Sequence, residues 1–376
     1  MKITDMTVLV HEHAWRHPIV APTGTQQLGI LTIETDEGLS GNSFVSGAAG
    51  EATSQIIKLI KPMLIGRNPS DIGSIWSDMW ARNRILLPMA MGAIDIALWD
   101  IMGKAANLPV YQLLGTYKSK VPAYFSSFQH ASPSDFAEEA LYWKGQGWIG
   151  YKLHPPTQRR HMGETVPVGA DVEACKAIRA AVGSDMSLML DAAFEYSYAE
   201  ALGVGHAIEE LSYSWYEDPL PANDIYGYTR LKQWLQIPIV ATEWTEGGVF
   251  ALPSWILARA TDALRGDVAI KGGITGMMKI AHLAEAFHLP FEVHDAFNAA
   301  NNVATLHVIM ASATAQWFEV LPFNQAGEFG LGNLWYGLAD APRIDAQGYA
   351  HAPEGPGLGL TIDWDRLRAS ALATLT

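Results

Sequence analysis

The sequence predicts an α/β fold: a modified (β/α)8 barrel of the TIM type that carries an α+β capping domain made by the two ends of the chain. Three observations support this. The chain has 376 residues, more than one ordinary domain holds. Its middle part alternates short strand-like runs with helical stretches eight times, and eight parallel strands close such a barrel. The two end segments follow a different pattern.

Residues 1–118 are predicted to form the α+β capping domain. The runs "ITDMTVLV" and "LGILTIETDEG" alternate apolar and polar residues, and Asp-Glu-Gly closes a hairpin-like turn. From Glu51 to Leu114 the apolar spacing becomes helical, as in "AMGAIDIALWDIMGKAANLPVYQLLG". Residues 330–376 leave the barrel rhythm again, so we expect them to return to the capping domain.

Residues 119–329 are predicted to form the barrel. Its eight strand-like runs are "VPAYFSS", "GYKLH", "SLMLD", "SWYEDP", "IPIVATE", "LRGDVAI", "PFEVHD" and "QWFEVL". The alternative is an open, doubly wound sheet. A glycine-rich phosphate loop after the first strand would favour that alternative, and the sequence has none there.

Composition excludes several classes of function. A net charge of −14 argues against nucleic acid or an anionic membrane as the partner. The single cysteine, Cys175, excludes an internal disulfide and fits a reducing compartment. The N-terminal apolar run is too interrupted for a signal peptide, and no uncharged apolar stretch is long enough for a membrane span. We therefore expect a soluble, cytoplasmic protein that acts on a small molecule.

Polar residues stand at or near the ends of seven of the eight strand-like runs. From the second of these residues onward they are 24 to 27 residues apart, which is about one β-α unit. In a barrel the ends of the strands converge on one rim, where active sites are found. The set comprises His154, Asp191, Glu217, Glu243, Asp267, His294 and Glu319.

Three acids of this set, Asp191, Glu217 and Glu243, lie on consecutive strands. Carboxylates brought this close would repel one another unless a cation neutralised them. Ligation by oxygen alone suits a hard ion with open positions, most simply Mg²⁺. Each acid alone could equally be a salt-bridged or capping residue, but the set at barrel spacing favours a metal site.

The remaining polar residues suggest proton transfer. Asp267 could bind one ring nitrogen of His294 and leave the other for a proton. Glu319 could donate a hydrogen bond if its pKa is raised, or it could pair with a lysine. Lys152 and His154 share one face of a strand because side chains alternate. By itself this pair is more simply a lysine at a strand end beside a hydrogen-bonded histidine, but opposite a metal site and a second histidine a functional role is favoured.

Together these residues resemble the enolase superfamily, and specifically its mandelate racemase-like subgroup. The resemblance extends over essentially the whole chain. It rests on "AIDIALWDIMGK", "LMLDA", "WYEDP", "ATEW", "GDVAIKGGITG", "VHDAF" and "PGLGL".

The resemblance implies a role for each residue of the set. Asp191, Glu217 and Glu243 match the three Mg²⁺ ligands of the family, and Asp267 with His294 matches its His-Asp dyad. Glu319 matches the acid that hydrogen-bonds the substrate carboxylate, and Lys152 matches the first lysine of a Lys-x-Lys motif. His154 replaces the second lysine, and Ala193 replaces an asparagine common after the first metal ligand. A homo-oligomer, from dimer to octamer, is also implied.

The chemistry that the family shares is removal of the proton α to a carboxylate, which gives an enediolate. We expect dehydration of a sugar acid to a 2-keto-3-deoxy acid. A racemase, epimerase or cycloisomerase is the alternative, and a non-catalytic relative is a third reading. We expect Lys152 to stay protonated and His154 to be either a second base or a spectator beside His294. Polar residues near the rim favour a sugar acid as the substrate, although they could equally cap helices; they are Glu246, Asp295, Asn298, Asn301 and Asn302. Specificity is expected from the cap loops at 13–27 and 46–51.

Overall fold

The computed structural model describes residues 1–13, 26–45, 49–127, 130–296, 298–321, 335–340 and 342–376. Most of the two cap loops expected to set specificity lies outside these residues. In the described part of the chain, no helix is long and apolar enough to cross a membrane.

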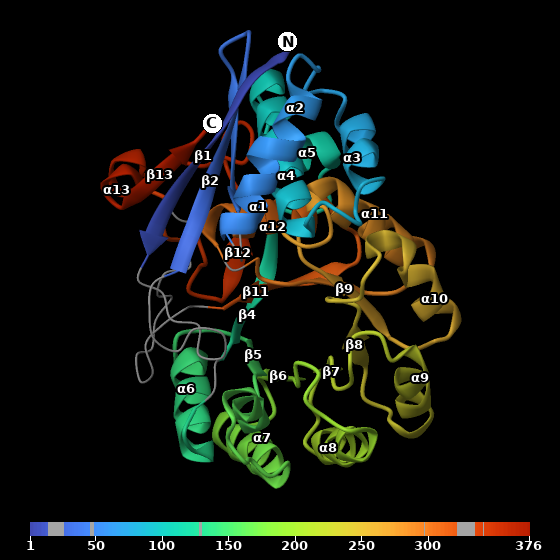
Figure 1. Cartoon of the computed structure of the whole chain (residues 1–376). Coiled ribbons are helices and arrows are strands. Elements are labelled where there is room, and N and C mark those ends of the chain that lie inside the picture. Colours follow the sequence, from blue (N-terminus) through green and yellow to red (C-terminus); the bar gives the residue numbers. More distant parts are fainter. Residues whose placement is uncertain (14–25, 46–48, 128–129, 297, 322–334, 341) are drawn as a thin grey trace.

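A closed barrel of parallel strands forms the body of the protein (Figure 1). Within the described residues its eight strands follow one another in sequence order, and the last pairs in parallel with the first. The predicted barrel is therefore confirmed. The strands are β4 (Lys120–Ser126), β5 (Gly150–Leu153), β6 (Ser187–Asp191), β7 (Trp215–Glu217), β8 (Ile239–Ala241), β9 (Ala263–Gly266), β10 (Phe291–Val293) and β11 (Ala315–Val320).

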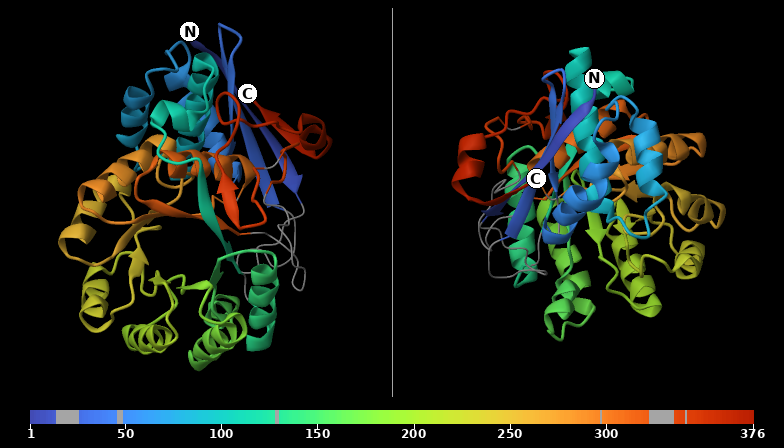
Figure 2. Two further views of the ribbon diagram at one scale, coloured as in Figure 1. Left: turned by 180° about the vertical axis from the view of Figure 1, so that it is seen from behind. Right: turned by 45° about the horizontal axis from the view of Figure 1, so that its top comes forward.

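Helices surround the barrel, as two views of the molecule show (Figure 2). Those that follow the strands are α6 (Pro133–Gly145), α7 (Gly169–Val182), α8 (Tyr198–Glu210), α9 (Ile225–Trp234), α10 (Leu252–Leu257), α11 (Gly273–Ala286) and α12 (Ala299–Ala311), with short 3-10 turns at Pro156–Met162 and Gly248–Phe250. Ser132 and Ser197 begin α6 and α8 as capping boxes, which explains where those helices start.

The inside of the barrel is layered. Leu188 and Leu190 of β6 join the large core between strands and helices, whereas Met189 between them joins a separate apolar cluster. That cluster plugs the barrel and consists of Tyr124, Met189, Trp215, Val240 and Ala263, with Trp317 against it. Because side chains alternate along a strand, the residue two positions further on each strand also points inward. These next positions are Ser126, Asp191, Glu217, Thr242, Arg265 and Glu319, all buried.

An antiparallel sheet and a helical layer form the cap above the barrel (Figure 1). The sheet order is β13-β1-β2-β3, and the predicted turn joins β2 to β3. The strands are β1 (Ile3–His13), β2 (Gln26–Thr35), β3 (Ser40–Val45) and β13 (Ala371–Leu375). The helices are α1 (Ala49–Gln55), a π-helical turn (Ile56–Ile60), α2 (Lys61–Leu64), α3 (Ile72–Trp80), α4 (Pro88–Ala106) and α5 (Val110–Leu114).

The C-terminal segment contacts both layers. It adds β12 (Tyr349–His351) to β4 of the barrel, and then α13 (Trp364–Ala369) and β13 pack on β1 of the cap. The predicted boundaries at residues 118/119 and 329/330 stay a prediction.

Helix α4 carries two buried aspartates, of which Asp95 attaches the cap to the barrel and Asp100 attaches α4 to β3 and to the C-terminal segment. Asp95 accepts a hydrogen bond from the backbone of Thr275 (2.8 Å) in the first turn of α11. Asp100 accepts from Leu358 of the C-terminal segment (2.9 Å) and from Asn42 of β3 (2.9 Å). Gly273 permits the close approach, because its φ is +79° and a β-carbon there would lie 2.4 Å from a carboxylate oxygen of Asp95. The motif "AIDIALWDIMGK" is thus a docking element in this fold.

Candidate active site

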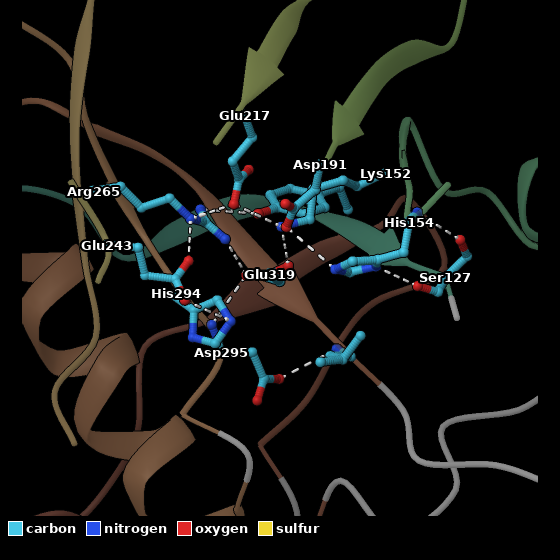
Figure 3. Close-up of polar contacts among 12 residues, drawn as sticks. Ser127, Lys152, His154, Asp191, Glu217, Glu243, Arg265, His294, Asp295 and Glu319 are labelled. Carbon is cyan, nitrogen blue, oxygen red and sulfur yellow. Dashed lines mark hydrogen bonds and ion pairs between the residues drawn. The ribbon is translucent and has the colours of Figure 1, made fainter. Parts of the chain in front are cut away.

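The eight residues predicted for the site all lie at the carboxyl ends of barrel strands. Four are on strands β5, β6, β7 and β11, and four follow directly after β5, β8, β9 and β10. Ion pairs and hydrogen bonds join all eight in one network through Arg265, and Figure 3 labels all of them but Asp267. Seven of the eight are at most 6% exposed, and His154 is partly exposed. The structure therefore brings the predicted set together.

Lys152 is the centre of the acidic half of this network. Its Nζ lies 2.6 Å from a Glu319 oxygen, 3.0 Å from Asp191 and 3.1 Å from Glu217. Burial and the nearby Arg265 would lower the pKa of Lys152, but the Glu217 and Glu319 carboxylates outweigh both and raise it well above its usual value. The surrounding carboxylates therefore favour the protonated form of Lys152, the form expected from the sequence.

Glu319 is held as an anion. Burial alone would raise its pKa, but Lys152 and Arg265 lower it well below its usual value. Its second carboxylate oxygen lies 2.5 Å from Arg265 Nη2 and accepts from the backbone of Asp295 (3.1 Å). Of the two alternatives for Glu319, the structure has the one in which it pairs with a lysine. The raised pKa that would make it a hydrogen-bond donor is not found.

Glu243 points into the barrel because the backbone before it turns. Val240 faces inward and Ala241 faces the helices, so simple alternation would send residue 243 outward. Thr242 has φ +90°, which is strained for a β-branched residue. Its hydroxyl donates to the Arg265 carbonyl and accepts from the Arg265 N–H, each at 3.0 Å. These bonds hold the turn that directs Glu243 at its neighbours.

Positive φ angles also occur next to the other two acids. Ala193 (+46°) lies two residues after Asp191, and Asp218 (+39°) directly follows Glu217. Asparagine tolerates this conformation better than alanine does. The replacement of the family's asparagine by Ala193 therefore leaves some strain in the backbone beside Asp191.

The Asp267–His294 pair is present as predicted. His294 Nδ1 lies 2.9 Å from an Asp267 oxygen, and Nε2 lies 3.5 Å from Glu243. Burial would lower the pKa of His294, but Glu243 and the bond to Asp267 raise it to about 9. The ring is thus oriented by Asp267 and faces the acid predicted to bind the metal.

His154 lies on the opposite side of the network from His294 (Figure 3). Its Nδ1 is 2.5 Å from the backbone oxygen of Ser127, and its Nε2 is 3.2 Å from Asp191. Because a carbonyl oxygen can only accept, Nδ1 must carry a proton. Proton transfer by His154 would therefore go through Nε2, the atom beside Asp191.

Comparison with known proteins assigns the family. Residues 5–115 match the model of the mandelate racemase / muconate lactonizing enzyme N-terminal domain, and residues 135–366 match the enolase C-terminal domain-like model. The chain belongs to the enolase superfamily. The subgroup is the mandelate racemase-like one, as the resemblance predicts, and the protein is an enzyme.

Three relatives illustrate the range of activities in this superfamily. An arabinonate dehydratase of Saccharolobus solfataricus is 31% identical over 88% of this chain and 87% of its own. An N-succinyl-L-Arg/Lys racemase of Bacillus cereus is 29% identical over 98% of this chain and 97% of its own. The crystal structure of D-glucarate dehydratase from Agrobacterium tumefaciens complexed with magnesium has a TM-score of 0.87 and 33% identity, covering 99% of this chain and 100% of that one. Dehydratases and a racemase thus share this fold.

The donor set of the enolase superfamily site fits a hard divalent cation. Asp191, Glu217 and Glu243 offer only carboxylate oxygens, and neighbouring pairs of them already share one cation, Lys152 or Arg265. Burial raises the pKa of Glu217 to about 8. The nearby charge of Asp191 also raises this pKa, whereas Arg265 and Lys152 lower it. With Glu319, four carboxyl groups face the two basic side chains Lys152 and Arg265, and the raised pKa of Glu217 reflects this crowding of acids.

The carboxylates do not yet converge on one point. Among the described residues, no three His, Cys, Asp or Glu side chains are arranged to hold an ion as they stand. Each of the three acids instead contacts Lys152 or Arg265. Binding of Mg²⁺ would require the carboxylates to reorient toward the ion, and the contacts of Glu217 and Glu243 with Arg265 each use only one of the two carboxylate oxygens.

Arg265 is the functional residue that sequence reasoning missed. It is fully buried on β9 and contacts Glu217, Glu243 and Glu319. The signal that could have found it was the alternation in "LRGD", which places residue 265 on the same face as Asp267.

The polar residues expected near the rim have mainly structural contacts. Asn298 caps α12 by accepting from the backbone of Asn301 (3.0 Å), and Asn302 accepts from the backbone of Ala296 (2.7 Å). Asp295 accepts from the backbone of Leu321 (3.2 Å), and Glu246 is exposed. Some of the polar residues that favoured a sugar acid as the substrate therefore have structural roles, such as capping a helix.

Proposed function

We propose that this enzyme removes the proton α to a carboxylate and dehydrates a sugar acid to a 2-keto-3-deoxy acid, with Mg²⁺ held by Asp191, Glu217 and Glu243. The observation that carries the proposal is the orientation of His294. Asp267 binds one ring nitrogen, and the other nitrogen faces Glu243, so a base points at the acids proposed to bind the metal. The magnesium complex of the related D-glucarate dehydratase supports the choice of ion.

When bound, Mg²⁺ would stabilise the negative charge that develops on the substrate carboxylate as the α-proton leaves. Lys152 is placed to bind the same carboxylate, since its protonated side chain lies beside two of the proposed ligands. Glu319 would keep Lys152 in place, because it is the nearest of the three acids around Nζ.

His294 is the proposed base, acting through Nε2. The carboxylate of Glu243 is the largest contribution that raises the pKa of His294. A role for Glu243 as a metal ligand would cancel that contribution and so shift His294 toward the neutral, proton-accepting ring. Asp267 would stabilise the imidazolium formed when Nε2 takes the α-proton. His294 would then give this proton to the β-hydroxyl, which leaves as water, and the resulting enol becomes the 2-keto acid.

A racemase, epimerase or cycloisomerase is the second candidate, and the position of His154 favours it. Nε2 of His154 lies beside Asp191 and that of His294 lies beside Glu243. Two histidines on opposite sides of a substrate carbon could remove a proton from one face and return one to the other. The racemase among the relatives shows that the superfamily supports such chemistry.

One experiment separates these candidates. The purified protein is incubated with Mg²⁺ and a library of sugar acids in D2O, starting with arabinonate and glucarate, and the products are followed by NMR and by a 2-keto acid assay. A 2-keto product supports dehydration. Exchange of the α-proton for deuterium without a keto product supports the second candidate. Neither signal with any acid, in a sample shown to bind Mg²⁺, would favour a non-catalytic relative.

A further inference from the structure

Arg265 is a buried cation that the proposed mechanism does not use. Ala263 belongs to the apolar plug of the barrel and Asp267 to the dyad, so residue 265 faces the barrel interior between them. Its side chain has no exposed surface. A buried guanidinium requires paired acceptors, because removing this charge from water costs several kcal/mol. The surroundings of Arg265 supply them.

The guanidinium contacts the three acids Glu217, Glu243 and Glu319 at strand ends (Figure 3) and the hydroxyl of Tyr124 within β4. Nε lies 2.6 Å from a Glu217 oxygen and donates to Glu243 at 3.0 Å. Nη2 donates to Glu319 at 2.5 Å, and Nη1 donates to the Tyr124 hydroxyl at 3.3 Å. The planar fork of arginine presents donors in several fixed directions, whereas a lysine ammonium is one point charge. The geometry therefore requires arginine specifically.

The backbone of Arg265 takes part as well. Its N–H and carbonyl hold the hydroxyl of Thr242, whose positive φ turns Glu243 inward. Side chain and backbone of one residue thus both fix the orientation of Glu243. Without the guanidinium, the carboxylates of Glu217, Glu243 and Glu319 would face one another with one buried cation fewer.

We propose that Arg265 is a positioning residue of the active site. It holds two of the metal-ligand carboxylates and Glu319 as a single array, so that the metal site and the acid that anchors Lys152 are set relative to each other. This inference rests on the proposed function. The opposite view is that Arg265 merely competes with the cation for Glu217 and Glu243, and the two views predict opposite changes in metal affinity.

The test compares three variants. Arg265→Lys keeps the charge and removes the fork. Tyr124→Phe keeps Arg265 and removes only the hydroxyl that it contacts. Arg179→Lys is the matched control, because Arg179 also donates to several acceptors, the backbone oxygens of Leu211, Gly183, Met186 and Ser212, on the outside of the barrel. Mg²⁺ affinity is measured by calorimetry on EDTA-treated, dialysed protein. Folding is checked by circular dichroism, and kcat and KM are measured at saturating Mg²⁺.

We expect Arg265→Lys to raise the Kd for Mg²⁺ by about 10- to 100-fold and to lower kcat by a similar factor, as losses of groups that orient metal ligands do. Tyr124→Phe should shift both values in the same direction by a smaller factor. Arg179→Lys should lower the melting temperature and leave Kd and kcat unchanged. A purely structural role for Arg265 would give the pattern of the Arg179 control.

The proposal is overturned if folded Arg265→Lys binds Mg²⁺ as tightly as the wild type, or more tightly. If that variant does not fold, Tyr124→Phe decides, and an unchanged Kd and kcat in it overturn the proposal. The affinity for Mg²⁺ can be measured without knowing the substrate. A wild type that binds Mg²⁺ but acts on no acid therefore refutes the proposed function, while the ratio of affinities still tests Arg265. A wild type that binds no Mg²⁺ refutes both.

Discussion

Replacing Lys152 by methionine tests whether the acids of the site depend on a buried cation. Lys152 has no exposed surface and lies within 3.1 Å of Asp191, Glu217 and Glu319. Methionine has a similar unbranched shape, so the change removes the charge and opens little space. Removing one partner of a buried ion pair costs about 3–5 kcal/mol, because the other charge stays buried without compensation. We expect Lys152→Met to lower the free energy of unfolding by about that amount in EDTA.

The assay is urea unfolding in EDTA and again with Mg²⁺, followed by circular dichroism. Wild type should gain about 2.7 kcal/mol at a Mg²⁺ concentration of 100 Kd. In the variant Mg²⁺ should recover part of the loss, because it neutralises Asp191 and Glu217. The matched control is Lys176→Met, whose lysine pairs with Glu173 on the surface, where both side chains are more than half exposed. Such a pair contributes about 1 kcal/mol or less. If Lys152→Met loses no more stability than this control, the reasoning is refuted.

Three further predictions concern other parts of the molecule. His154→Asn should keep turnover, because the His294–Asp267 pair carries out proton transfer; steady-state kinetics with the substrate found in the library screen checks this. His307 accepts from the Tyr111 N–H and donates to the Leu358 carbonyl, and burial lowers its pKa to about 4. The unfolded chain therefore binds more protons than the folded protein between pH 6.5 and 4. The free energy of unfolding should fall as the pH drops through this window, by about 3 kcal/mol at pH 4. Urea unfolding at a series of pH values should show a smaller dependence of this free energy on pH for His307→Gln than for the wild type. Gly273→Ala should lower the melting temperature, because a β-carbon at this positive φ would meet Asp95 at 2.4 Å and separate the cap from α11.

Each of these has a result that would contradict it. Loss of turnover in a folded, Mg²⁺-binding His154→Asn would make His154 a second base and favour the two-base chemistry. An identical pH slope in wild type and His307→Gln would show that this histidine is not what destabilises the protein in acid. A β-carbon on Gly203 of α8 would have nothing within 4 Å of it, so Gly203→Ala is the control for Gly273→Ala. Equal melting temperatures for the two glycine variants would refute the docking role of Gly273.

The sequence was sufficient for those parts of the site that depend on strand spacing alone. Regular intervals between polar residues located the ends of the strands, and a barrel brings such ends together whatever the details of packing. Glu319 was found in this way, and Lys152 was found because it shares a strand face with His154. Their direct contact could not be predicted, because it depends on β5 and β11 both pairing with β4 when the barrel closes.

Two features required the structure. Glu243 points inward only because Thr242 adopts a positive φ, and period-two alternation would have placed it outward. The sequence could have placed Arg265 in the site, since it shares a strand face with Asp267. It could not have shown which residues Arg265 contacts. The acidic partners of Arg265 lie on β7, after β8 and on β11, up to 54 residues away in the sequence, and Tyr124 on β4 is 141 residues away.

The most direct test of the central claim is deuterium incorporation by wild type and by His294→Asn in D2O, with Mg²⁺ and the best acid from the library. The account predicts that wild type forms a 2-keto acid labelled with deuterium from the solvent. It predicts that folded, Mg²⁺-binding His294→Asn forms no product and exchanges no α-proton. Product formation or exchange by His294→Asn at the rate of the wild type would contradict it.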